Sequence, residues 1–124
     1  MKANGLMVGN YLKNDSIVVK IDARSIFDMY NDNPKYEPIE LNEYWLEKLG
    51  FYKNENTKHW SITYFNSEKM GIDKWSLFIG FDSTMGYWFG VQDLILDQVA
   101  LNLIKYVHQL QNLYFSLTGK ELTI

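Results

Sequence analysis

The sequence contains no cysteine, and this absence removes two kinds of site. Without thiols the chain can form neither a disulfide bond nor a zinc centre with thiolate ligands. Histidine is scarce as well, with only His59 and His108 in 124 residues. Neither is followed by another metal ligand at the i+4 spacing that brings two side chains to one helix face. We therefore expect no metal site and no cofactor.

The glycine and serine residues also lack the arrangements that catalysis uses. The 8 glycines include no phosphate-cradling pattern, and residues 80–90 contain neither a Walker nor a dinucleotide-binding arrangement. No serine stands in a Gly-x-Ser-x-Gly elbow. Acidic residues are scattered without a spacing that singles out a pair, so a small hydrolase with a carboxylate site is only an alternative. The sequence predicts no catalytic residue and favours a protein that is not an enzyme.

An excess of positive charge and a long hydrophobic run are missing too. With 12 basic and 15 acidic residues the formal net charge is −3, which provides no general attraction to a phosphate backbone. No apolar run is long enough to span a membrane. The first residues have no apolar stretch behind them of the kind found in signal peptides. We expect a cytoplasmic protein without membrane contact.

Aromatic residues, by contrast, are abundant and make up 16% of the chain. Large rings let a small domain bury much area from few positions, and most of them are expected to fill the core. Strand alternation places others on an outward face, where they can form a protein interface or stack on bases. Trp75 and Trp88 are our candidates for such a binding surface.

Short strands are predicted at the start of the chain. Residues 6–12 and 16–21 read as strands joined by a turn at Asn14 and Asp15, since the second is rich in β-branched side chains. Residues 23–30 are predicted to continue as a third strand. This succession resembles part of an SH3-like barrel.

The middle of the chain combines one short helix with hairpins. Asn42 can cap the helix and Gly50 can end it in the left-handed conformation. Alternating apolar residues then predict strands that begin near Trp60, Trp75 and Tyr87. Residues 92–103 fit a helical spacing as well as a strand spacing. We favour a strand over 97–103, because the preceding hairpins need a continuing sheet.

The end of the chain predicts an amphipathic helix. Apolar side chains recur at helical spacing from Val107 to Leu117, Gly119 is the expected left-handed residue after the helix, and Leu122 can fold back over its last turn. Four polar residues on the remaining surface are candidates for partner contact. Alternatively, they face solvent or satisfy backbone groups where the helix docks. These residues are His108, Gln109, Gln111 and Asn112.

Together these patterns predict a single α+β domain over residues 1–124. Its sheet would be curled and mainly antiparallel, with about six strands, a short helix and a C-terminal helix packed on the sheet.

Segments of the chain also resemble a known family. Residues 106–124 read YVHQLQNLYFSLTGKELTI, and residues 1–4, 8–11, 36–41 and 45–51 match the same pattern. This combination is similar to a family of small uncharacterised proteins from gut anaerobic bacteria, their phages and their mobile elements. The resemblance brings no reaction, cofactor or catalytic residue with it.

The function expected from all this is binding. The chain is predicted to be a non-enzymatic binding or accessory protein of a phage or mobile element, acting through contacts with another protein or with itself. A nucleic-acid-binding module is an alternative, but the lysines are too diffuse to form a basic stripe.

Overall fold

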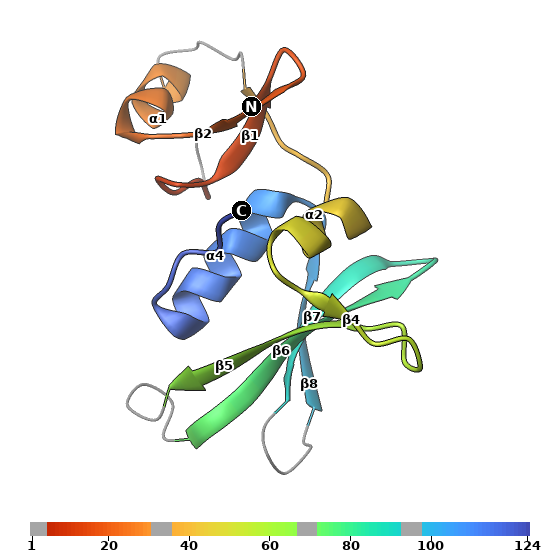
Figure 1. Cartoon of the computed structure of the whole chain (residues 1–124). Helices are drawn as coiled ribbons and strands as arrows, with labels where there is room; N and C mark the ends of the chain where they lie inside the picture. Colours follow the sequence, from red (N-terminus) through yellow and green to blue (C-terminus); the bar gives the residue numbers. More distant parts are fainter. Residues whose placement is uncertain (1–4, 31–35, 67–71, 93–97) are drawn as a thin grey trace. The chain divides into compact units, whose positions relative to one another are not determined.

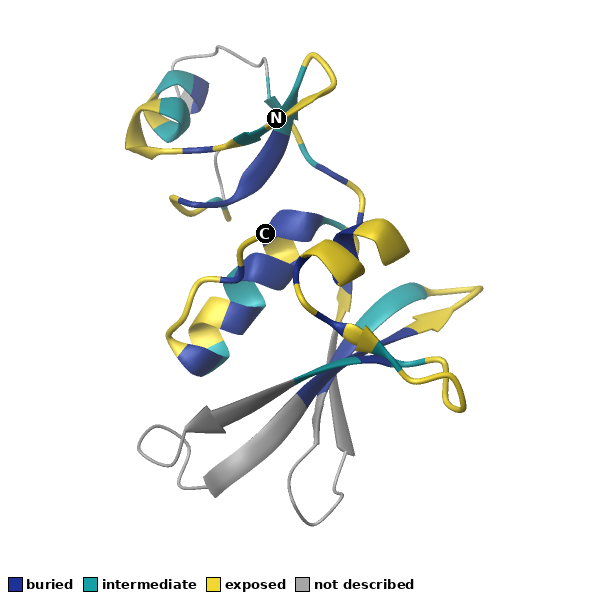
Figure 2. Cartoon of the chain, viewed as in Figure 1, coloured by how far each residue is buried: buried dark blue, intermediate teal, exposed yellow. Residues whose placement is uncertain are grey.

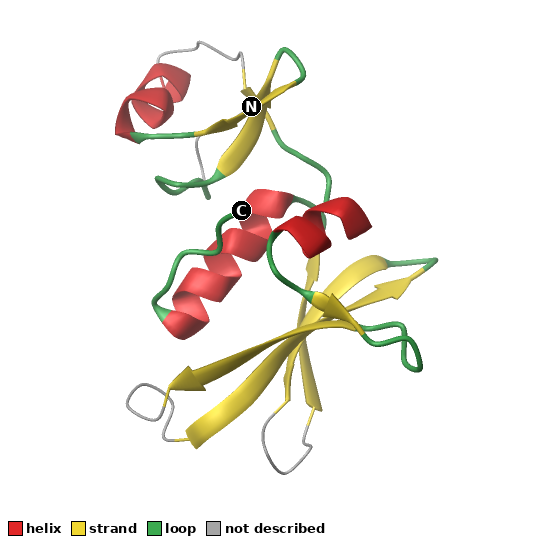
Figure 3. Ribbon diagram, in the orientation of Figure 1, coloured by secondary structure: helices red, strands yellow, loops and turns green. Residues whose placement is uncertain are grey.

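The computed structural model describes residues 5–30, 36–66, 72–92 and 98–124 (Figure 1). By backbone contacts the chain divides into two compact units. Unit 1 combines residues 1–40 with residues 106–123, and unit 2 consists of residues 41–105 together with Ile124. Helices and strands occur in both units, so the α+β class is confirmed (Figure 3).

Unit 1 contains a small antiparallel sheet with the strand order β2-β1-β3. The strands are β1 (Tyr11–Asn14), β2 (Ile17–Lys20) and β3 (Tyr36–Glu37). A turn joins β1 to β2 one residue later than predicted, at Asp15 and Ser16, and both residues are left-handed, with φ 50° and 70°. Two positive φ angles in a row suit the right-handed twist of a two-residue hairpin.

Helix α1 (Ala23–Tyr30) replaces the third strand that the sequence predicted, so that prediction was wrong. Asp22 starts the helix, because its carboxylate accepts a hydrogen bond from the backbone N–H of Ser25 at 2.9 Å. Ile26 and Met29 lie one helical turn apart and both join a cluster built on Leu12 and Ile21. Burial of this helical stripe outweighs the strand preference of the β-branched and aromatic residues in the segment.

Helix α4 (Val107–Thr118) confirms the predicted C-terminal helix, and it packs against β1 within unit 1. It ends at Gly119, whose φ is 76° and whose N–H donates to the carbonyl of Phe115. Beyond this turn Leu122 is buried, as the predicted fold-back requires. Along α4 itself, Figure 2 shows buried positions in dark blue alternating with exposed positions in yellow. Val107 and Leu110 of the predicted apolar stripe are fully buried, whereas Leu117 is only half-buried.

Unit 2 is built on an antiparallel sheet with the order β4-β5-β6-β7-β8. The strands are β4 (Tyr52–Lys53), β5 (Trp60–Asn66), β6 (Ile72–Asp82), β7 (Gly86–Gln92) and β8 (Gln98–Ile104). Strand β8 confirms the strand that we favoured within 92–103. One face of the sheet is buried, because alternate residues along paired strands point the same way. Its buried members include Trp60, Leu77, Ile79, Phe89 and Ile104.

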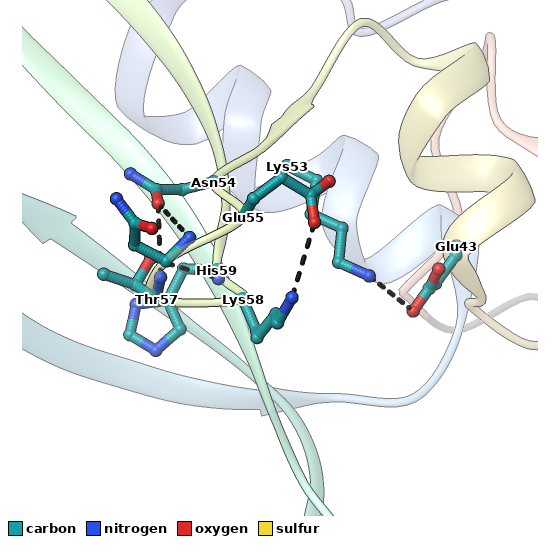
Figure 4. Close-up of polar contacts among 8 residues, drawn as sticks. Glu43, Lys53, Asn54, Glu55, Thr57, Lys58 and His59 are labelled. Atoms are coloured by element: carbon teal, nitrogen blue, oxygen red, sulfur yellow. Dashed lines mark hydrogen bonds and ion pairs between the residues drawn. The ribbon is translucent and has the colours of Figure 1, made fainter.

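Helix α2 (Glu43–Lys48) precedes this sheet and begins as predicted. The side-chain oxygen of Asn42 accepts from the backbone N–H of Trp45 at 3.0 Å, and Gly50 follows the helix with φ 95°. Figure 4 shows Lys53 of β4 reaching Glu43 of the helix, with 3.6 Å between the ammonium and a carboxylate oxygen.

The sheet arrangement differs in detail from the prediction. The described strands form two antiparallel sheets, of three and five strands, instead of one curled sheet, and neither closes on itself. The SH3-like barrel is therefore not confirmed. Among the described residues, none of the helices combines the length and the apolar character needed to cross a bilayer.

Candidate functional site

The side-chain amide of Gln111 joins three segments of unit 1. Its oxygen accepts a hydrogen bond from the backbone N–H of Tyr11 at 2.9 Å. Its nitrogen donates to the carbonyl of Gly9 at 3.1 Å and to that of Leu122 at 3.0 Å. The amide is buried, and all three bonds satisfy backbone groups where the helix meets the N-terminal segment and the tail.

Asn112 and Asn10 extend this network. The amide nitrogen of Asn10 donates to the side-chain oxygen of Asn112 at 2.8 Å, and Asn112 donates in turn to the carbonyl of Gly5 at 2.6 Å. The side-chain oxygen of Asn10 accepts from the N–H of Met7 at 2.7 Å. The loop that leads into β1 is therefore held against α4 by amide groups.

A small cavity of ≈ 150 Å³ opens beside these amides, and we call it the Gln111 cavity. Amide side chains and one carboxylate supply its polar lining, and apolar side chains supply the rest. The lining residues are Met7, Val8, Gly9, Asn10, Gln111, Asn112, Phe115, Glu121 and Leu122.

The other two predicted residues of α4 lie elsewhere. Gln109 is exposed, and its side-chain oxygen accepts from the backbone N–H of Tyr106 at 3.0 Å, closing a capping box at the start of the helix. His108 is only 7% exposed, and its ring stacks on that of Tyr106 at 5.8 Å between centroids. Its Nδ1 has no hydrogen-bond partner, and burial lowers the pKa of the imidazole.

In unit 2 Trp88 belongs to an aromatic cluster. Its ring meets His59 edge-on at 5.1 Å between centroids and Phe78 edge-on at 5.3 Å. Gly80 is the partner of Trp88 on the neighbouring strand, and a Cβ atom added there would overlap the indole ring. The absence of a side chain at position 80 lets the indole lie flat against the strand.

This cluster lies on the sheet face opposite to the buried one. In the strand register Ser61 pairs with both Phe78 and Tyr52, and Trp88 pairs with Leu103. Trp88 also pairs with Gly80, two residues after Phe78 on β6, so all these positions share one face of the sheet. Tyr52 and Leu103 are strongly exposed, at 77% and 57%, whereas Phe78 is buried. We call the set of Tyr52, His59, Phe78, Trp88 and Leu103 the outer aromatic face.

Trp75 cannot be assigned to either place. Its backbone lies in β6 and pairs with Tyr64 of β5, but its side chain lies outside the described part of the structure. Of the candidate residues, Gln111 and Asn112 meet at the cavity and Trp88 lies on the outer aromatic face, whereas His108 and Gln109 contact Tyr106.

Sequence reasoning missed several residues of both places. Asn10 and Glu121 line the cavity, and His59 completes the aromatic cluster. The pairing of Asn10 with Asn112 spans 102 positions, so no local pattern could reveal it. The one available signal was the glycine at position 9, which lies inside the first predicted strand, residues 6–12.

The chemistry available to these groups is recognition through amides, rings and one carboxylate. Within the described residues, no three or more histidines or carboxylates gather in a way that could hold a metal ion. Comparison of the chain with models of known families, with curated proteins and with solved structures finds no match.

Proposed function

We propose that the chain is a non-enzymatic binding or accessory protein whose outer aromatic face contacts another protein or a second copy of itself. The family resemblance described above supports the further proposal that a phage or mobile element encodes the chain. The observation that carries the proposal is the exposure of Tyr52 and Leu103 beside the ordered ring of Trp88.

Rigid aromatic side chains are well suited to protein contacts. Trp and Tyr are enriched among the residues that contribute most to binding, because they bury a large area while losing little side-chain freedom. Trp88 is only half-buried, and contacts with His59 and Gly80 already fix its ring. A partner that covers this face would therefore bury an ordered surface.

The charges near this face favour a protein over a nucleic acid. Lys58 directly precedes His59, and its ammonium is 3.4 Å from a carboxylate oxygen of Glu55 (Figure 4). This acidic neighbour and the net charge of −3 oppose binding to a phosphate backbone. Nucleic-acid binding stays the second candidate because exposed rings can stack on bases.

The test compares two variants of the whole protein. Changing both Tyr52 and Leu103 to serine removes the exposed apolar groups of the face. Phe81→Ser is the matched control, because Phe81 is 62% exposed but in register with Tyr87 on the opposite face. Partner capture from a host extract and sedimentation at several concentrations then measure both modes of association.

We expect the double variant to lose the partner or the self-association by about tenfold or more, and the control to keep it. Equal association of all three proteins would refute the proposal. Binding of a labelled oligonucleotide that weakens steeply with salt would support the second candidate instead.

A further inference from the structure

We propose that the Gln111 cavity binds a single arginine side chain from a partner peptide or protein. The site lies within unit 1 and shares no residue with the outer aromatic face, so the two proposals can fail separately.

The size of the cavity argues for a side chain and against a larger ligand. Sites for cofactors and drug-sized molecules usually enclose about 300–1,000 Å³. The Gln111 cavity has ≈ 150 Å³, about half of the lower end of that range. That space accommodates one long side chain, in the way that interface pockets receive an anchor residue from the partner.

The charge at the cavity comes from Glu121. Its carboxylate reaches the mouth over Gly9, where a Cβ atom added to the glycine would be 2.9 Å from Oε1. Within the described part of the chain, no hydrogen bond or ion pair occupies this carboxylate. The bond from Gln111 to the carbonyl of Leu122 anchors the next residue, so the tail that carries the carboxylate is held in place.

The remaining lining suits the stem and the flat group of an arginine. Met7 and Val8 present apolar surface to the aliphatic part, and the ring of Phe115 is 39% exposed. A guanidinium group can stack on an aromatic face while its N–H groups donate to a carboxylate. Lysine lacks the planar group and would make only the second of these contacts.

Lys20 supplies a built-in competitor. Its Cε atom would be 3.8 Å from the same added Cβ atom on Gly9, so its ammonium shares the neighbourhood of Glu121. The Lys20 ammonium repels an incoming cation. Removal of the Lys20 charge is therefore expected to strengthen binding, whereas removal of the Glu121 charge weakens it.

The probe is the blocked tripeptide acetyl-Gly-Arg-Gly-amide, and its citrulline analogue is the neutral control of equal shape. Titration into the isotopically labelled full chain is followed by the amide signals of Gly9 and Asn112. The variants are Glu121→Gln, Phe115→Ala and Lys20→Met, and Glu47→Gln on α2 is the matched control for loss of an exposed carboxylate.

We expect saturable shifts with a dissociation constant on the order of 1 mM, as suits one anchor side chain without its interface. Binding should weaken about fivefold or more in Glu121→Gln and in Phe115→Ala, strengthen in Lys20→Met, and stay unchanged in Glu47→Gln. Equal binding of the citrulline peptide, an unaffected Glu121→Gln variant, or no shift at high peptide concentration would each overturn the proposal. Spectra of the free variants establish that each is folded.

Discussion

Gln111 and His108 are both buried on α4, one turn apart, but their polar atoms have opposite surroundings. Every hydrogen-bonding atom of the Gln111 amide is engaged, whereas Nδ1 of His108 has no partner. An unsatisfied buried polar group costs about 1–3 kcal/mol, so the unpaired Nδ1 of His108 lowers the stability of the fold. The same burial disfavours its charged form.

His108 should therefore make the protein sensitive to mild acid. Above its ordinary pKa of 6.5 the imidazole is neutral in the folded and the unfolded chain, and its charge has no effect on stability. Because the folded pKa is lowered, the unfolded chain binds the proton first as the pH falls below 6.5. The free energy of unfolding is expected to fall by up to about 1.4 kcal/mol per pH unit, until the folded pKa is reached.

Urea unfolding at a series of pH values measures this dependence. The variant His108→Leu has no titrating group at this position and should show a flatter profile between pH 6.5 and the acid limb. Parallel profiles for the variant and the wild-type protein would contradict the assignment.

At this scale the sequence could predict position but not burial. Spacing correctly put His108, Gln111 and Asn112 on one helix surface, because they lie at i, i+3 and i+4. It could not tell that Gln111 bonds to Gly9, and Asn112 to Gly5 and Asn10, each about a hundred positions away. Hydrogen bonds of such long range depend on how the chain closes, and nothing local encodes that.

At the scale of elements, prediction succeeded where a signal was repeated and failed where it was brief. Alternation over many residues identified β5, β6 and β7, and the caps Asn42 and Gly119 identified both predicted helices. Helix α1 has only 8 residues, and its start depends on the bond between Asp22 and Ser25. Its helical spacing was too short to compete with a strand-like composition.

The packing of β6 on β7 gives a prediction for Gly80. In Gly80→Ala the new methyl group overlaps the indole of Trp88, so the ring must leave its place. We expect a loss of about 1–3 kcal/mol in the free energy of unfolding and a changed near-ultraviolet circular dichroism spectrum.

Gly86→Ala is the matched control within the same hairpin. Its φ is 94°, so alanine is strained there, but nothing lies within 4 Å of the added methyl group. This variant should lose about 1 kcal/mol and keep the aromatic spectrum. If Gly80→Ala also kept the spectrum, the cross-strand contact with Trp88 would not exist in solution.

At the scale of the whole molecule, unit 2 is an insertion within the sequence of unit 1. The chain leaves and re-enters unit 1 at adjacent points, because Glu40 and Tyr106 form a β-bridge and the N–H of Val107 donates to the carbonyl of Ile39 at 2.9 Å. No periodicity could reveal this, because the pairing joins residues on either side of the whole insertion.

This topology predicts that the insertion can be removed. Residues paired across antiparallel strands have Cα atoms about 5 Å apart, which a short glycine-serine linker spans. A variant with such a linker in place of residues 41–105 should keep the amide signals of the cluster around Leu12 and Ile21, with reduced thermal stability because the unit is small. Collapse of signal dispersion at low temperature would contradict this expectation.

The turn between β1 and β2 is a place where the protein can be stabilised. Asp15 and Ser16 hold a backbone conformation that glycine adopts freely and that other residues adopt at a cost. The turn therefore carries backbone strain at an exposed tip outside both proposed sites. Asparagine in place of Asp15 and glycine in place of Ser16 should relieve this strain and raise the stability of the protein.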